Sequence, residues 1–287
     1  MNTDQQAPAS GGTHPGQLDW LAIWRAMYDA ERAQGEAVAP VGSDCWAGRA
    51  PRYAAAMRRT PQPDALMQAV LPQLRPTDTV LDIGAGTGRY TTVLAQHVAH
   101  VVALEPSAAM REQLEQSVAE SGLTNITIVA EGFPPATPVR GDVAFSAHVL
   151  YGVREFAPFV QAMHASATRT CMLALMIRHL SGLVSPFWEL FYGEPRAPLP
   201  AALEAFNALY QLGYLATWQL LPSTTMRYAT LDEAVEDMRV RLRFLPDTER
   251  DARLREALRE RLVVGDDALL AFPDQLAANA LIQWDVA

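Results

Sequence analysis

The feature that most constrains the fold is a glycine-rich stretch at residues 79–90, TVLDIGAGTGRY. A β-branched and apolar run precedes three glycines at alternate positions, and a helix-compatible run follows from Tyr90 to Val98. This order predicts a strand, a tight turn and the start of a helix. Glycine adopts positive φ at little cost and admits a ligand where a Cβ would block it. The free N–H groups of the helix start then face that ligand.

The spacing of the glycines separates two classes of ligand. A dinucleotide-binding loop follows the pattern G-x-G-x-x-G, whose third glycine would stand at the position of Arg89. Here the third glycine comes one residue earlier, at Gly88, and Asp82 stands two residues before Gly84. A carboxylate so close to the loop disfavours the pyrophosphate of NAD and favours a cationic ligand.

On these residues the stretch resembles the first motif of the class I S-adenosylmethionine-dependent methyltransferases, which is an acid, any residue and then G-x-G-x-G. The resemblance implies S-adenosylmethionine as the cofactor, because its sulfonium and ammonium groups need no pyrophosphate site. It covers residues 76–177, with a looser echo at 46–53. The loop residues that it assigns to the cofactor are Asp82, Gly84, Ala85, Gly86 and Gly88.

A second acid is expected beside this loop. Residues 100–104 form the predicted second strand, and Glu105 follows its carboxyl end, where an acid can accept both ribose hydroxyls of an adenosine. Ser107 is the expected N-cap of the next helix. The resembled family often has an acid, a serine and a methionine in this order. That order implies cofactor contacts for Pro106 and for the Met110 thioether against adenine; core packing is the alternative for Met110.

The third predicted strand, 125–130, ends in the run Glu131, Gly132 and Phe133. In the resembled family an acidic or small residue after this strand meets the adenine amino group. The match is looser here, because Phe133 occupies the usual acid position. All three residues are nevertheless candidates for the cofactor site.

The fourth predicted strand, 142–147, supplies the candidates for catalysis. Ligands of open α/β sheets bind beyond the carboxyl ends of the strands, which directs Ser146, His148 and Tyr151 to the site. Ser146 is assigned to the cofactor, and His148 is the best candidate for a substrate-facing base, with a cofactor or packing contact as the alternative. Methyl transfer requires a base only when the acceptor arrives protonated, since alignment can supply much of the acceleration.

Segments outside the core are expected to cover the site. Residues 18–34 have helical periodicity, as a packed helix or as a lid. By the family resemblance Tyr53 reaches the methionine end of the cofactor; a buried ring is the alternative. Residues 178–213 contain many aromatic side chains and several prolines, which predicts two short helices in a cap over the pocket. Those aromatics favour an apolar or aromatic acceptor.

The alternation of strands and helices from 76 to 177 predicts a Rossmann-like, doubly wound α/β sheet. The sheet is expected to be mostly parallel with an antiparallel last strand, plus N-terminal helices and a helical cap insertion. A disordered tail, 1–17, precedes a single domain, 18–287. The domain is divided into 18–75 for the N-terminal helices, 76–177 for the cofactor core, 178–213 for the cap and 214–287 for C-terminal strands and helices.

Composition narrows the functional classes. A net charge of −9 and a pI near 5.2 argue against a nucleic-acid substrate. The sequence contains no run of 18 apolar residues, so no membrane span is predicted. The N-terminus lacks a signal-peptide pattern. Cys45 and Cys171 have no metal or redox spacing, and no histidines have metal-ligand spacing, so no metal is expected. Cytoplasmic localisation is the default.

These observations favour a methyltransferase that uses S-adenosylmethionine on a small-molecule acceptor, mainly by proximity and orientation. The alternatives are a non-catalytic S-adenosylmethionine-binding regulatory module and an NAD-linked oxidoreductase. The sequence leaves open the acceptor, the methylated atom and the oligomeric state.

Overall fold

The structure is a computed structural model of the chain and describes residues 18–38, 46, 49–59, 62–223, 226–273 and 278–286. The predicted disordered tail, 1–17, lies outside the described residues. So does part of the segment around Trp46 that echoes the methyltransferase pattern.

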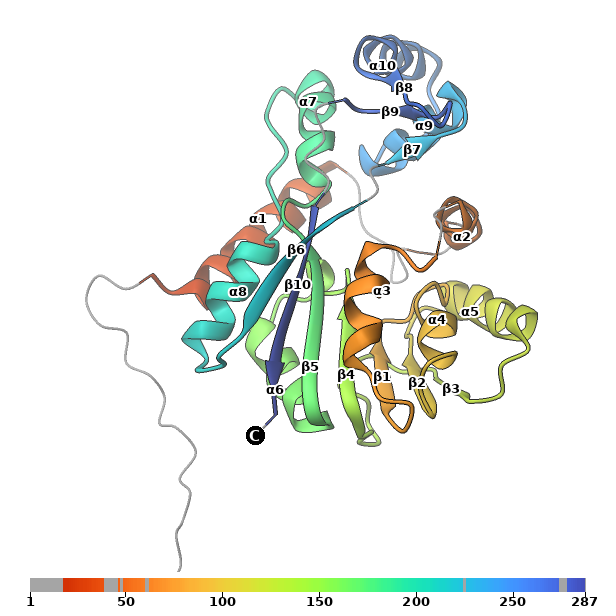
Figure 1. The fold of residues 1–287 in the computed structure, drawn as a ribbon. Helices are drawn as coiled ribbons and strands as arrows, with labels where there is room; N and C mark the ends of the chain where they lie inside the picture. The colour runs from red at the N-terminus through yellow and green to blue at the C-terminus, as the bar shows by residue number, and fades with distance from the viewer. Residues whose placement is uncertain are drawn as a thin grey trace, which may run out of the picture.

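A seven-stranded sheet forms the centre of the molecule, in the order β3-β2-β1-β4-β5-β10-β6 (Figure 1). Strands β1 to β5 are parallel, and β10 lies antiparallel between β5 and β6. This confirms the predicted fold class and places the last strand inside the sheet. The strand bounds are β1 Thr79–Ile83, β2 His100–Leu104, β3 Ile126–Val129, β4 Gly141–Ala147, β5 Ala167–Met176, β6 Thr217–Pro222 and β10 Ala278–Asp285.

Helices cover both faces of the sheet because each turns one apolar stripe toward it. Side chains of α1, α6 and α8 form one buried cluster with the sheet, and side chains of α3 and α4 form another. Helix α5 packs through Leu114 against Ala85 and Ala103. The bounds are α1 Trp20–Val38, α3 Ala65–Val70, α4 Thr91–Ala95, α5 Ala108–Ser121, α6 Phe156–Ser166 and α8 Ala202–Gln211.

The ends of α5 follow the sequence signals. The Ser107 hydroxyl accepts a hydrogen bond from the Met110 N–H (3.3 Å), as expected of an N-cap. Gly122 ends the helix with φ +68°, in the left-handed region that favours glycine. Helix α5 therefore runs from the carboxyl end of β2 to the opposite edge of the sheet.

A smaller unit, called the cap here, lies beyond the carboxyl ends of the parallel strands (Figure 1). It consists of α7 Ser181–Tyr192, α9 Leu231–Arg241, α10 Thr248–Arg261 and the three-stranded sheet β7-β9-β8. The three strands are β7 Arg227–Tyr228, β8 Val263–Val264 and β9 Leu270–Ala271. These elements share one buried cluster of their own.

The structure divides the segment 178–213, which the sequence assigned to the cap as a whole. Helix α7 belongs to the cap, whereas α8 packs on the main sheet beside α1 and α6. The small side chains Ala202, Ala205 and Ala208 line the buried side of α8 and allow this close packing. The rest of the cap comes from the C-terminal part of the chain.

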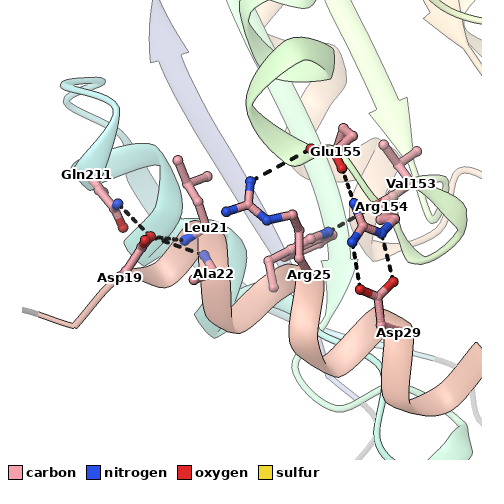
Figure 2. Close-up of polar contacts among 10 residues, drawn as sticks. Asp19, Leu21, Ala22, Arg25, Asp29, Val153, Arg154, Glu155 and Gln211 are labelled. Carbon is pink, nitrogen blue, oxygen red and sulfur yellow. Dashed lines mark hydrogen bonds and ion pairs between the residues drawn. The ribbon is translucent and has the colours of Figure 1, made fainter. Parts of the chain in front are cut away.

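Helix α1 is a packed layer rather than a lid. Trp24 has no exposed surface. At one end of the helix Asp19 accepts a hydrogen bond from Gln211 of α8 (2.9 Å), and further along Asp29 accepts two from Arg154 (both 2.7 Å; Figure 2). Arg154 follows the short turn η2 Leu150–Gly152, so α1 supports the segment that carries Tyr151.

Candidate cofactor and acceptor site

The three loop glycines have different structural roles. All have positive φ, at +76° for Gly84, +59° for Gly86 and +84° for Gly88. A Cβ on Gly84 would lie 2.3 Å from the Val149 side chain, and one on Gly88 would lie 2.8 Å from that of Leu114. A Cβ on Gly86 would meet only the Gly84 carbonyl oxygen, at 4.0 Å. Two glycines therefore serve chain packing, and Gly86 leaves open space above the loop.

Asp82 ends β1 beneath this loop and is buried. Its carboxylate accepts a hydrogen bond from the Thr91 hydroxyl (2.6 Å), at the start of α4. Burial raises the pKa of Asp82 to about 6, and the nearby Glu105 carboxylate adds to the increase, while the Thr91 bond opposes it. The two acids predicted at neighbouring strand ends are thus close enough to interact.

Glu105 bridges the glycine loop and the start of α5. Its carboxylate accepts hydrogen bonds from the N–H groups of Gly86 (2.9 Å) and Ser107 (2.8 Å). The side chain is buried, with 6% exposure. Glu105 therefore stands directly beside the open position at Gly86, as the sequence predicted for a ribose-binding acid.

The other predicted adenine contacts are less open. Met110 is buried, and Pro106 is exposed at the head of α5. The Phe133 ring packs against Phe159 of α6, with 5.2 Å between centroids. Phe133 therefore has a packing role at the sheet edge; its contact with a cofactor remains a prediction, as do those of Pro106 and Met110.

Three further candidates for the cofactor site, Glu131, Gly132 and Ser146, differ in their exposure and hydrogen bonding. Glu131 accepts a hydrogen bond from the Ala136 N–H (2.6 Å), and Gly132 is exposed. Ser146 has no exposed surface, and its hydroxyl donates to the Ile83 carbonyl of β1 (3.1 Å). Ser146 therefore offers no open surface to a ligand, because the adjacent strand occupies its side chain.

Three rings follow the carboxyl ends of β4 and β5. His148 and Tyr151 are stacked, with 6.3 Å between centroids, and Tyr151 lies 4.5 Å from His179. His148 has φ +62°, a left-handed conformation that is uncommon for residues other than glycine, and its N–H donates to the Ala174 carbonyl (2.8 Å). Strained backbone of this kind concentrates at functional sites.

The surroundings of these rings keep both histidines neutral. Burial lowers the pKa of His148 to about 4, and the Arg89 charge contributes. Burial lowers the pKa of His179 to about 3, with a further contribution from Arg241. Both side chains nevertheless retain partial exposure. Both rings therefore lie partly exposed beyond the carboxyl ends of β4 and β5.

Helix α2, Ala50–Arg58, packs against α5 and is tied to the cap by ion pairs (Figure 1). Arg52 pairs with Glu236 (3.1 Å) and Arg59 with Glu233 (2.5 Å), both on α9. Between them Tyr53 is 36% exposed, yet burial raises the pKa of its hydroxyl. The Tyr53 ring packs edge-on against Trp46, with 5.1 Å between centroids, and its contact with a cofactor remains a prediction.

The sequence analysis missed the ion pair behind the loop. Arg89 pairs with Asp64, whose carboxylate also accepts a hydrogen bond from the Tyr90 hydroxyl (3.2 Å). Asp64 caps α3 by accepting from the Met67 N–H (3.0 Å). Arg89 could have been recognised, because it directly follows the glycine loop. Its partner Asp64 could not, because it lies far from the loop in sequence.

His179 lies three residues after Met176, the last residue of β5. That place was the signal available in the sequence, because strand ends converge on one edge of a parallel sheet. In the part of the chain that the structure describes, no group of three or more His, Cys, Asp or Glu residues could hold a metal ion. No helix in that part is long and apolar enough to cross a membrane.

A family of methyltransferase domains matches residues 80–169, from β1 into β5. A protein-L-isoaspartate O-methyltransferase of Polaromonas is 47% identical over 56 residues, which are 20% of this chain and 24% of that protein. A 23S rRNA uracil methyltransferase of Klebsiella pneumoniae is 43% identical over 58 residues, or 20% and 13% of the two chains. The similarity to each of these two proteins thus spans less than a quarter of the relative's length.

Similarity in structure extends further. The YcgJ protein of Bacillus subtilis aligns with 76% of this chain and 97% of its own, with a TM-score of 0.52 and 14% sequence identity. At that identity the match supports the fold. Together with the matching domain family, it places the loop at Gly86 and the acids Asp82 and Glu105 in a known architecture. Residues 80–169 therefore match a methyltransferase domain, within a chain that has a Rossmann-like fold.

Proposed function

We propose that this chain transfers a methyl group from S-adenosylmethionine to a small-molecule acceptor. The observation that carries the proposal is the open position above Gly86, flanked by the Asp82 and Glu105 carboxylates. S-adenosylmethionine supplies a methyl group on a positively charged sulfur. The residues around Gly86 fit such a cofactor, because a Cβ would fill the cradle and the two acids complement a cation.

Each acid has a distinct part in holding the cofactor. Glu105 lies at the carboxyl end of β2, where its oxygens accept hydrogen bonds from the Gly86 and Ser107 N–H groups. When the cofactor binds, ribose hydroxyls can replace these N–H groups as donors. Asp82 contributes negative charge beneath the loop, at the end that receives the methionine part.

Cofactor affinity is expected to fall as pH decreases through about 6. In the free protein Asp82 has a pKa of about 6, and a bound cation stabilises its ionised form and lowers that pKa. Above the free-state pKa Asp82 is already ionised, so affinity is constant; below it, binding must release a proton, and affinity decreases about tenfold per pH unit. Calorimetry between about pH 5 and pH 8 measures this dependence.

The control for this titration is Asp82→Asn. That variant is expected to bind S-adenosylmethionine more weakly at neutral pH and to lose the decline near pH 6. Glu105, the other acid beside the loop, is unchanged in this variant. An unchanged pH profile in Asp82→Asn would remove Asp82 from the binding of the cation.

At the acceptor end, His148 is proposed as the group that receives a proton. Its imidazole is neutral above about pH 4, so it can accept a proton at neutral pH. It lies beside Tyr151, whose hydroxyl accepts a hydrogen bond from the Met176 N–H and is held in place by it. The left-handed backbone at His148 directs its ring away from the regular path of β4.

Replacing His148 by asparagine is expected to slow turnover by about a hundredfold, the lower range for loss of a general base. Asparagine tolerates the left-handed backbone better than alanine, so the loop conformation is retained. The affinity for S-adenosylmethionine should remain unchanged, as measured by calorimetry beside single-turnover rates. Equal turnover for the variant and the wild type across pH would leave His148 with a packing role only.

A small acceptor is favoured over a nucleic acid because the chain has a net charge of −9. Calorimetry with S-adenosylmethionine and with NAD tests the cofactor; binding of NAD alone would contradict the proposal. Labelled S-adenosylmethionine with an acceptor panel tests catalysis. Tight cofactor binding without methylated product would favour the non-catalytic regulatory module.

A further inference from the structure

The outermost strand on one side of the main sheet, β6, has an open edge. The strand order places β6 beyond β10, and no other strand among the described residues pairs with its outer side. Its register with β10 is regular from Thr217 to Pro222, without a bulge. Edge strands that stay unpaired commonly carry a charged side chain, a bulge or a proline. Residues 217–221 have none of these, and Pro222 stands only at the end of the strand.

An apolar surface adjoins this edge. Trp218 and Leu220 share one face of β6, because side chains alternate along a strand. The Trp218 ring packs against Phe206 of α8, with 5.5 Å between centroids (Figure 1). On α8, Leu203, Phe206 and Tyr210 are spaced three and four residues apart, so they lie along one side of the helix. These five residues, called the edge patch here, form a continuous apolar surface beside the open strand.

The edge patch lies in an uncharged part of an acidic chain. No Asp, Glu, Lys or Arg occurs from residue 205 to residue 226, although 19% of the chain is charged. The buried centres of protein interfaces are depleted in charged residues and enriched in Trp and Tyr. Because the chain has a net charge of −9, two copies repel each other on average. A surface without charge is where a second copy can approach.

The exposed area of the patch agrees with contact between two folded chains. Leu203 is 50% exposed, Tyr210 68%, Trp218 41% and Leu220 59%. Together they expose on the order of 400 Å², at about 200 Å² for a large side chain. The exposed side chains of Thr217 and Gln219 and the backbone of the strand edge add to this area. The total approaches the roughly 800 Å² that each partner buries in a stable interface.

The N-terminal residues of the same chain offer no comparable surface. Residues 1–17 contain Met1 as their only large apolar side chain, among polar residues, alanines, prolines and glycines. A second copy instead supplies the same apolar patch and the same open strand. The partner that matches this surface in both respects is therefore another copy of this chain.

From these observations we propose that two copies of the chain form a symmetric dimer through β6 and the edge patch. Two identical strands pair antiparallel about a two-fold axis, the commonest symmetry of homo-oligomers. An axis at Gln219 pairs all of residues 217–221 with the second copy and leaves Pro222 outside. Each Trp218 then lies opposite Leu220 of the second copy, on the face that carries α8, and the two Gln219 residues lie opposite each other. The two main sheets become one continuous sheet.

The dimer is independent of the proposed methyl transfer. In the sheet β6 is separated from β1, which carries the glycine loop, by β10, β5 and β4. Neither β6 nor α8 contains a residue assigned to the cofactor or to catalysis. Variants of the edge patch can therefore test the dimer without changing the cofactor site.

Sedimentation equilibrium of the full chain at micromolar concentration measures the association. The wild type is expected at twice the chain mass of 31.4 kDa. Trp218→Lys introduces a charge at the centre of the patch and should weaken dimerisation by about tenfold or more, since aromatic residues at interface centres carry much of the binding energy. Leu220→Lys changes the residue opposite Trp218 and should have a similar effect. Far-ultraviolet circular dichroism shows whether each variant is folded.

Leu245→Lys is the matched control for these two variants. Leu245 lies between α9 and α10, outside the patch, and is 85% exposed. This variant also replaces a large exposed apolar side chain by lysine, and it should leave the dimer unchanged.

Cross-linking tests the pairing of the strands. Gln219→Cys places two thiols opposite each other, where Cβ atoms lie about 4.5–5.5 Å apart across a strand pair. This separation is close to the about 3.5–4.5 Å of a disulfide. Mild oxidation should therefore link the two copies. Thr217→Cys, on the same exposed strand, lies opposite Leu221 of the second copy and should not link. The wild type gives the background from Cys45 and Cys171.

Four outcomes would overturn the inference. These are a wild type that stays monomeric, a dimer that persists in Trp218→Lys and Leu220→Lys, an equal loss in Leu245→Lys, and equal cross-linking of Gln219→Cys and Thr217→Cys. Titration with S-adenosylmethionine on the same samples separates this inference from the proposed function. A dimer that binds no cofactor contradicts the methyltransferase alone, whereas a monomer that binds cofactor normally removes only the dimer.

Discussion

Valine in place of Gly86 is expected to lower the affinity for S-adenosylmethionine by about a hundredfold, from overpacking of a site where extra methyl groups cost about 1–3 kcal/mol. The new side chain projects into the open space above the loop, where, among the described residues and apart from its two chain neighbours, the nearest atom is the Gly84 carbonyl oxygen at 4.0 Å. Gly84 and Gly88 cannot serve for this test, because a Cβ at either position collides with the protein's own side chains.

The matched control is Gly122→Val. Gly122 has a similar φ of +68° and no atom within 4 Å of a built Cβ. It lies at the end of α5, at the edge of the sheet opposite to the site. Both variants carry the same strain of a side chain in the left-handed region, roughly 1–2 kcal/mol. Urea unfolding should give similar losses of stability for the two, while calorimetry shows weaker cofactor binding for Gly86→Val alone. Equal cofactor affinities would contradict the assignment of the loop.

The sequence predicted the sheet well because its signals are local. The β-branched runs at β1 and β2, the N-cap Ser107 and the terminating Gly122 each depend on a few neighbouring residues. The insertion of β10 was one of two possibilities for an apolar C-terminal run. The acids Asp82 and Glu105 were also predictable, since the carboxyl ends of parallel strands meet at one edge.

The rest depended on contacts between distant segments. The Val149 side chain, far along the chain, fills the space beside Gly84 and leaves the space beside Gly86 open. The sequence around the loop does not show this difference. Ser146 was assigned to the cofactor by its position at a strand end, but the adjacent β1 carbonyl occupies its hydroxyl. The composition of α8 did not show that this helix packs on the main sheet and not in the cap. Its small buried residues form a stripe that could pack against either.

The largest effect on stability is expected for Trp24→Ala, at a position far from the cofactor loop. Trp24 has no exposed surface and packs against Phe156, with 4.7 Å between ring centroids. Loss of a buried tryptophan leaves a cavity and costs about 3–5 kcal/mol, a large part of the roughly 5–15 kcal/mol that stabilises a typical domain. Urea unfolding should show a lower midpoint, with α1 detached from the sheet.

Two further variants separate packing from the polar contacts of α1. Trp24→Phe keeps most of the apolar contact but leaves the Val153 carbonyl without the indole N–H that now donates to it (2.8 Å); an unsatisfied buried acceptor costs about 1–3 kcal/mol. Asp29→Ala removes the exposed pair with Arg154 (Figure 2) and should change stability little, since solvent screens such pairs. Because Val153 follows the turn that holds Tyr151, Trp24→Phe should also reduce turnover. A larger loss in Asp29→Ala than in Trp24→Phe would mean that the surface ion pair, rather than the buried indole, attaches α1 to the core.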